Sequence, residues 1–133
     1  MKKINIFICH SFSDTSGYNE VLGIVGNCLV PVEDYSCTKD DAIYHSIAKV
    51  ELENAMMRRI DLCDIFILIL TERFFGSRWM QFEEAYARNC NTPVLPVLPV
   101  GHTYTTEMAS RFPNTIALDE GLIHAMLALI EQN

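Results

Sequence analysis

Short apolar runs alternate with longer amphipathic stretches along the whole chain. Runs rich in Ile, Val and Leu predict strands over 4–9, 29–32, 64–70, 93–100 and 115–118. Apolar residues at helical spacing predict helices over 18–28, 46–62, about 77–90, part of 102–111, and 119–131. Strand and helix alternate about five times without a hairpin turn of the Asn-Gly type. This order predicts a three-layer, flavodoxin-like α/β fold with a central, mostly parallel five-stranded sheet.

Polar loops follow three of the predicted strands, over 10–17, 34–41 and 71–79. In open parallel sheets, ligands bind in the crevice outside the carboxyl ends of the strands. We therefore expect the three loops to meet there and to form the ligand site. Pro31 has no N–H to donate to a neighbouring strand, so the run at 29–32 is expected at or near a sheet edge.

The helix after the third strand contains two adjacent glutamates in different settings. Trp79, Phe82, Glu83 and Tyr86 follow the spacing i, i+3, i+4 and i+7, which predicts one aromatic face with a carboxylate in it. Glu84 lies about a hundred degrees further round the helix. It precedes Arg88 by four residues, a spacing that predicts an ordinary solvent-exposed ion pair. Glu83 is therefore the candidate for a functional site.

Length and composition predict a single domain over residues 1–133, with half of the 133 residues hydrophobic and 20% charged. The longest clean apolar run, 65–70, is far too short to span a membrane. The N-terminus shows no signal-peptide pattern. The net charge of −7 argues against nucleic acid and anionic membranes as partners. We expect a cytoplasmic protein.

Neither the cysteines nor the histidines predict a metal site. The five cysteines are odd in number and form no Cys-x-x-Cys pair, which favours buried, reduced thiols in the cytosol. The four histidines are too scattered along the chain to suggest zinc. No metal and no cofactor is expected.

Three segments together resemble TIR domains. Residues 6–11, followed by Asp14, resemble the first-strand motif of that family. Residues 75–87 resemble its Ser-x-Trp-x-x-x-Glu helix, and residues 93–97 resemble the strand that follows. The resemblance covers nearly the whole chain. Each motif alone is weak, but their order and spacing are fairly specific.

Within that family, the chain is similar to the ThsB-like TIR domains of the bacterial Thoeris anti-phage system. The shared features are the Asp-Tyr-Ser loop at 34–36, Trp-x-Gln-Phe-Glu at 79–83 and the Pro-x-Gly turn at 99–101. Two positions depart from the subgroup. Ser36-Cys37-Thr38 stands where Ser-Val-Pro is usual, and Glu84 stands where an aliphatic residue is usual.

The resemblance implies an enzyme that breaks the nicotinamide–ribose bond of NAD+, with Glu83 as the catalytic glutamate. Breaking an N-glycosidic bond builds an oxocarbenium-like ribose, and a carboxylate stabilises that charge. Nicotinamide is already cationic in NAD+, so it leaves without a strong general acid. Restricting water favours internal attack, which gives a cyclic or modified ADP-ribose signal. The implied partners are NAD+ as substrate, other TIR surfaces in self-association, and a separate effector protein that responds to the product.

Eight residues are candidates for substrate binding: His10, Ser11, Phe12, Asp34, Tyr35, Ser36, Arg78 and Trp79. Each has a simpler alternative. The polar residues of the first loop also suit loop capping. Asp34 also suits an Asx turn, and the aromatic residues also suit packing of the core. Arg78, near a helix N-terminus, also suits the ordinary surface.

Two other functions remain open from the sequence. The first is a non-catalytic TIR interaction module, and the second is an enzyme similar to nucleoside deoxyribosyltransferases. A phosphoacceptor receiver domain is excluded, because it needs paired acids after the first strand and an Asp after the third. Residues 9–11 read Cys-His-Ser, and residues 70–71 read Leu-Thr.

Overall fold

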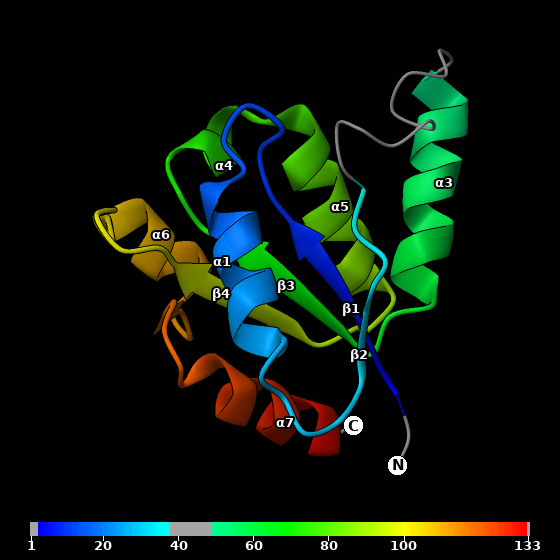
Figure 1. The fold of residues 1–133 in the computed structure, drawn as a ribbon. Coiled ribbons are helices and arrows are strands. Elements are labelled where there is room, and N and C mark those ends of the chain that lie inside the picture. Colours follow the sequence, from blue (N-terminus) through cyan, green and yellow to red (C-terminus); the bar gives the residue numbers. More distant parts are fainter. Residues whose placement is uncertain (1–2, 38–48, 133) are drawn as a thin grey trace.

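Five parallel strands form the central sheet in the order β2-β1-β3-β4-β5 (Figure 1). The structure is a computed structural model that describes residues 3–37 and 49–132. The strands are β1 (Ile4–Cys9), β2 (Val32–Asp34), β3 (Ile65–Ile69), β4 (Val94–Leu98) and β5 (Ile116–Ala117). The predicted fold class is confirmed, and in the described residues every strand pair of the sheet is parallel.

Helices cover both faces of the sheet. They are α1 (Ser16–Val25), α3 (Lys49–Asp61), α4 (Arg73–Gly76), α5 (Arg78–Asn89), α6 (Thr106–Arg111) and α7 (Leu122–Glu131). Buried residues of α1 and α7 pack on one face, and buried residues of α3, α4, α5 and α6 pack on the other. No helix in the described ranges is long and apolar enough to cross a membrane.

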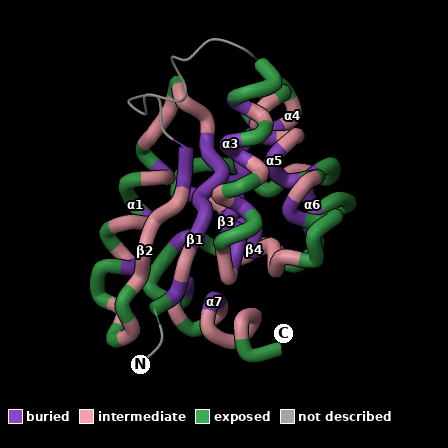
Figure 2. Tube along the Cα trace, turned by 90° about the vertical axis from the view of Figure 1, so that its right-hand side faces the viewer, coloured by how far each residue is buried: buried purple, intermediate pink, exposed green. Residues whose placement is uncertain are grey.

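Alternation along the strands divides the core into these two halves. Phe66 and Leu68 of β3 face the α5 side, whereas Ile65, Ile67 and Ile69 face the α1 side. All five residues of β3 are buried, and β1 is almost as deeply buried (Figure 2). Strands covered on both faces are continuously apolar, and this is why the sequence pattern located them well.

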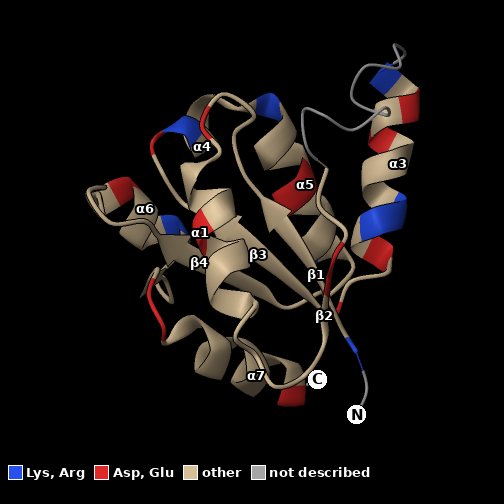
Figure 3. Ribbon diagram, viewed as in Figure 1, with Lys and Arg blue, Asp and Glu red and all other residues tan. Residues whose placement is uncertain are grey.

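The edge strand β2 corrects the sequence-based prediction. The apolar run 29–32 was expected to be the strand, but β2 begins at Val32, after Pro31, and Leu29 is 93% exposed. Pairing with β1 sets this register: the Ile4 N–H donates to the Pro31 carbonyl at 2.8 Å, and Ile4 lies opposite Val32. A sheet edge tolerates charged residues, so the acidic residues at 33–34 become strand residues (Figure 3).

Other boundaries differ from the prediction as well. The loop predicted over 71–76 contains the short helix α4, because Phe74 inserts fully into the core there. The helix predicted over 46–62 is α3, Lys49–Asp61, and positions 46–48 lie outside the described residues. Residues 38–41 of the second predicted polar loop also lie outside them.

The strand order reverses between β1 and β3. From β1 the chain moves outward to β2, and it then returns to β3 on the other side of β1. Loops leaving the carboxyl ends of β1 and β3 therefore diverge, which opens a crevice at this switch point.

Candidate functional site

The buried face of helix α5 lies beside the predicted aromatic stripe and shares Glu83 with it. Its buried residues are Met80, Glu83, Glu84 and Ala87, and the three aromatic side chains Trp79, Phe82 and Tyr86 are only partly buried. The aromatic stripe is therefore partly buried and packs against the core, and the fully buried face lies beside it. Tyr86 instead reaches α3, where its hydroxyl donates to Asp61 at 2.7 Å. The aromatic stripe packs at the edge of the core towards α3.

The two glutamates lie on either side of the centre of this buried face. Met80 and Ala87 are about twenty degrees apart around the helix, and Glu83 and Glu84 are about fifty degrees away on opposite sides of them. Glu83 contacts the thiol of Cys9 at the end of β1. Glu84 points the other way, towards α6. One turn of helix thus presents carboxyl groups to two separate environments.

The beginning of α5 is fixed by local hydrogen bonds. The hydroxyl of Ser77 caps the helix by accepting the Met80 N–H at 3.2 Å. The side chain of Gln81 donates to the carbonyls of Phe74 and Phe75, at 3.2 and 2.9 Å. These bonds tie α5 to α4 and set the rotation at which Glu83 faces β1.

Glu83 is a buried carboxyl group without a cationic partner in the described part of the chain. Glu83 is 4% exposed. Burial raises the pKa of Glu83 to about 8, and a hydrogen bond with Cys9 offsets only part of this effect. The free protein therefore holds Glu83 largely protonated at neutral pH. A raised carboxyl pKa at the edge of a parallel sheet is typical of functional sites.

Glu84 is also buried, but it is paired. Its carboxylate accepts from Arg88, and Arg111 of α6 lies 3.6 Å from its other oxygen. The predicted pair with Arg88 is confirmed, whereas the predicted solvent exposure is wrong, because Glu84 is 2% exposed. Arg111 also lies over the rings of Phe74 and Phe112, at 5.2 and 5.3 Å. This second partner buries the carboxylate and could not be read from helical spacing.

His10 follows β1 and is 4% exposed. Its Nδ1 lies 3.0 Å from the Ile8 carbonyl, which only accepts, so Nδ1 carries the proton. Its Nε2 has no partner among the described residues. The ring stacks on Tyr18 at 4.4 Å and meets Phe12 edge-on at 5.7 Å. Burial lowers the pKa of His10, so it is a neutral imidazole with a buried acceptor to offer.

The polar side chains at the end of β2 and in the loop after it make structural hydrogen bonds within the protein. Asp34 accepts hydrogen bonds from the Tyr18 hydroxyl, the Ser36 hydroxyl and the Ser36 N–H, the last at 2.9 Å. Ser36 in turn accepts the Ile8 N–H at 2.7 Å, and the Tyr35 N–H donates to the Ile6 carbonyl at 2.8 Å. The Asx-turn alternative thus accounts for Asp34, and the loop extends the pairing of β2 with β1.

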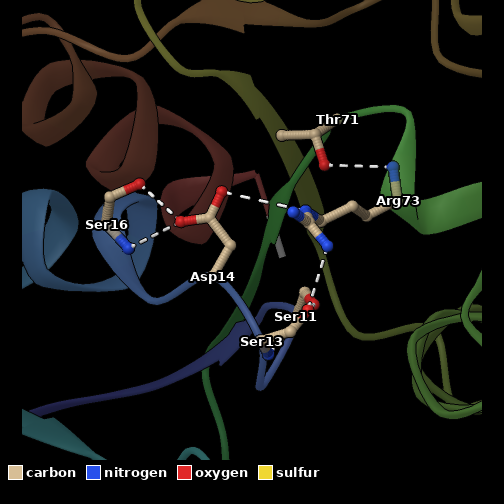
Figure 4. Close-up of polar contacts among 6 residues, drawn as sticks. All are labelled: Ser11, Ser13, Asp14, Ser16, Thr71 and Arg73. Atoms are coloured by element: carbon tan, nitrogen blue, oxygen red, sulfur yellow. Dashed lines mark hydrogen bonds and ion pairs between the residues drawn. The ribbon is translucent and has the colours of Figure 1, made fainter.

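The first and third polar loops meet at a small hollow beside α1. Its walls include Ser11, Asp14, Thr71 and Arg73, and Figure 4 shows the contacts between the loops. Arg73 donates from Nη1 to the Ser13 hydroxyl at 3.0 Å, and its Nε lies 3.9 Å from the Asp14 carboxylate. Of the predicted site residues, only Ser11 lines this hollow.

The remaining predicted residues lie on the α5 side. Phe12 and Trp79 are partly buried and pack against the core there, and Trp79 meets Phe82 edge-on at 6.1 Å. Arg78 is the exposed first residue of α5 and does not line the hollow. The arginine that does line it, Arg73, was missed from the sequence. The available signal was its position four residues after the buried strand β3.

The two parts of the site are linked through the end of β1. Cys9 contacts Glu83, and Ser11, two residues later, lines the hollow. Two residues of chain span at most about 7 Å, a length that a nucleotide covers. Within the described ranges, no cluster of His, Cys, Asp and Glu could hold a metal ion, and no disulfide joins any two of the five cysteines. No protein-family model and no curated protein matches the chain.

Proposed function

We propose that this chain is a TIR-domain enzyme that cleaves NAD+ at the nicotinamide–ribose bond. In this proposal it makes a cyclic or modified ADP-ribose signal in bacterial anti-phage defence, as a ThsB-like protein of a Thoeris system. One observation carries the proposal: Glu83 is buried and unpaired with any cation in the described residues, and it contacts the carboxyl end of β1. A structural carboxylate would be expected to have a cationic partner, as its neighbour Glu84 has.

The raised pKa of Glu83 suits a cationic substrate. An opposite charge nearby favours the ionised form of a carboxyl group. The nicotinamide ring of NAD+ carries a positive charge, so its binding beside Glu83 would lower the pKa of Glu83 from about 8 and ionise the group. The carboxylate then faces the ribose as the C–N bond breaks. The bonding electrons leave with nicotinamide, which becomes neutral, and the positive charge moves to the ribose, where Glu83 stabilises it.

The other residues of the site have roles that follow from their positions. The buried Nε2 of His10 is an acceptor for a ribose hydroxyl or for the carboxamide N–H. Phe12 and Trp79 offer aromatic surfaces on the same side of the sheet as Glu83. Water-poor surroundings favour attack by a nucleophile of the substrate over hydrolysis. A separate effector would respond to the product, and self-association through TIR surfaces would regulate it. The proposed compartment is the cytoplasm, where free thiols persist.

The test is release of nicotinamide from NAD+ by the purified protein, alone and with lysate from phage-infected cells. We expect Glu83→Gln to lower the rate by about 10²-fold or more, because the neutral amide cannot stabilise the ribosyl cation. Glu131→Gln, at the exposed end of α7, is the matched control and should retain the activity. Mass spectrometry of the product distinguishes cyclic or modified ADP-ribose from the linear form.

Each outcome favours one function. No nicotinamide release under any activating condition would favour a non-catalytic interaction module. Base release from deoxynucleosides, but not from NAD+, would favour an enzyme similar to deoxyribosyltransferases. Linear ADP-ribose as the sole product would contradict the signalling part of the proposal and leave NAD+ cleavage intact.

A further inference from the structure

The polar hollow beside α1 occupies the switch point of the sheet. Ser11 follows β1, Thr71 follows β3 and Pro99 follows β4, so three carboxyl ends converge on it. Glu83 does not line it. The part of the candidate site around Glu83 therefore does not include this hollow.

Helix α1 approaches the hollow unusually closely. A Cβ on Gly17 would lie 2.7 Å from the Ile69 side chain, so only glycine allows the first turn of α1 to pack against the end of β3. First-turn N–H groups have no partner within their helix and carry partial positive charge. The Asp14 carboxylate already takes one of them, the Ser16 N–H, at 3.2 Å.

Two side chains in the hollow have unused donors. Thr71 is 6% exposed, and its hydroxyl oxygen accepts the Arg73 N–H at 3.3 Å. No described residue accepts the hydroxyl proton of Thr71. The Arg73 side chain is 53% exposed, and its described contacts are one hydroxyl and a carboxylate at 3.9 Å. A guanidinium carries five donors, so this arrangement leaves several for a further acceptor.

We infer that this hollow binds an oxygen of a diphosphate, with Arg73 as its principal ligand. The inference rests on the proposed function, because it assigns the diphosphate of the dinucleotide to this place. The free volume is about 10 Å³, enough for one oxygen-sized atom. One phosphate oxygen therefore enters between Thr71 and the first turn of α1. The rest of the group lies outside, against the guanidinium, in the bidentate geometry that arginine favours.

Asp14 acts in this arrangement as an internal anion that the ligand displaces. Its Oδ1 is held by Ser16, while its Oδ2 lies at the long distance of 3.9 Å from Arg73. A carboxylate beside an anionic ligand costs binding energy. The inference therefore makes opposite predictions for two neighbouring charges. Removing Arg73 weakens binding, whereas neutralising Asp14 strengthens it.

The experiment measures the affinity of the full chain for inorganic pyrophosphate and for ADP-ribose by calorimetry. We expect Arg73→Gln to weaken both by about tenfold or more, because charge-assisted hydrogen bonds are lost. The affinities of Arg73→Lys should fall between those of the natural sequence and those of Arg73→Gln, since lysine keeps the charge but lacks the planar guanidinium group. Asp14→Asn, which keeps an oxygen for Ser16, should tighten both. Arg58→Gln, at an exposed position of α3, is the matched control and should leave both within about twofold. Thermal melts establish that each variant is folded.

Three results would overturn the inference. They are no binding of either ligand to the natural sequence, the same affinity in Arg73→Gln as in the natural sequence, and equal weakening by Arg73→Gln and Arg58→Gln. The last would indicate a diffuse electrostatic effect. These readouts involve no cleavage, so they separate the two proposals. Binding that depends on Arg73 in a protein that never cleaves NAD+ would contradict only the proposed reaction.

Discussion

The two sides of helix α5 solve the problem of a buried carboxyl group in opposite ways. On the α6 side, Glu84 is held between two arginines whose guanidinium groups reach water. On the β1 side, Glu83 has a thiol for a neighbour, and burial raises its pKa to about 8. The residues are adjacent in sequence and equally buried, at 2% and 4% exposure. The comparison shows that burial alone does not distinguish a structural carboxyl group from a functional one. The groups that contact the carboxyl do distinguish them.

Replacing Glu84 should have the largest effect on stability. Glu84→Gln removes the charge that Arg88 and Arg111 share, and it leaves a buried amide against two guanidinium groups. We expect a loss of about 3 kcal/mol in the free energy of unfolding, at the low end for a buried pair because both arginines are half exposed. Glu83→Gln at pH 4.5 should change it by less than about 1 kcal/mol, since at that pH Glu83 is neutral in the folded state and about half protonated in the unfolded state. Urea denaturation measures both. Equal losses would contradict the contrast between the two sides.

The pH dependence of stability should come from the β1 side. The folded pKa of Glu83, about 8, lies above its ordinary value of 4.5, so between these pH values the native state holds a proton that the unfolded chain has released. Stability from this group is complete below pH 4.5 and falls as the pH rises to about 8. Between pH 6 and pH 8 the loss should reach about 2 kcal/mol. The measurement is the difference in stability between the natural sequence and Glu83→Gln at several pH values. A constant difference would show that the folded pKa is not raised.

A smaller effect is expected from Arg111 on the α6 side. Arg111→Gln loses the ion pair with Glu84 and the contacts with the rings of Phe74 and Phe112. Because the side chain is 45% exposed, we expect a cost of only about 1 kcal/mol. The same change at Arg78, for which the described residues provide no ion pair, should be neutral within about 0.5 kcal/mol. Chemical denaturation at low and high salt tests this, and only the Arg111 effect should shrink with salt.

The smallest effect is expected where the aromatic stripe of α5 meets α3. Tyr86→Phe removes one hydroxyl that donates to Asp61 in an exposed contact. The expected cost is about 0.5 kcal/mol, the lower range for a single hydrogen bond. Thermal melts of Tyr86→Phe and Glu84→Gln, measured side by side, compare the two losses of stability. A cost above that of Arg111→Gln would mean that the stripe, and not the buried face, anchors the helix.

The order of elements was predictable because each strand of the core carries its own signal. β1 and β3 are buried on both faces, so their apolar runs could be located within a residue or so. β2 could not, because its position depends on pairing with β1 and not on its own hydrophobicity. The short helix α4 was missed because only two of its residues, the buried Phe74 and the partly buried Phe75, pack against the core, which is too few for a helical pattern.

The candidate site divides in the same way. Spacing alone singled out Glu83 and paired Glu84 with Arg88, and both features are present in the structure. Spacing also identified the aromatic stripe, but helical periodicity could not tell how deeply that arc of the helix is buried. The burial of Glu84 depends on Arg111, which comes from α6 and lies 27 positions further along the chain. Arg73 joins Asp14 only because the strand order brings two loops together.

The sequence by itself determined the fold class, the core strands and the unusual position of Glu83, because these depend on local periodicity. The tertiary structure decided which environment each glutamate occupies. It also decided that Asp34 and Ser36 form hydrogen bonds that hold the loop after β2 against β1. It placed a polar hollow at the switch point. Those features depend on contacts between residues far apart in the chain. The physical reason is that a carboxyl group takes its charge state from the groups that surround it in space.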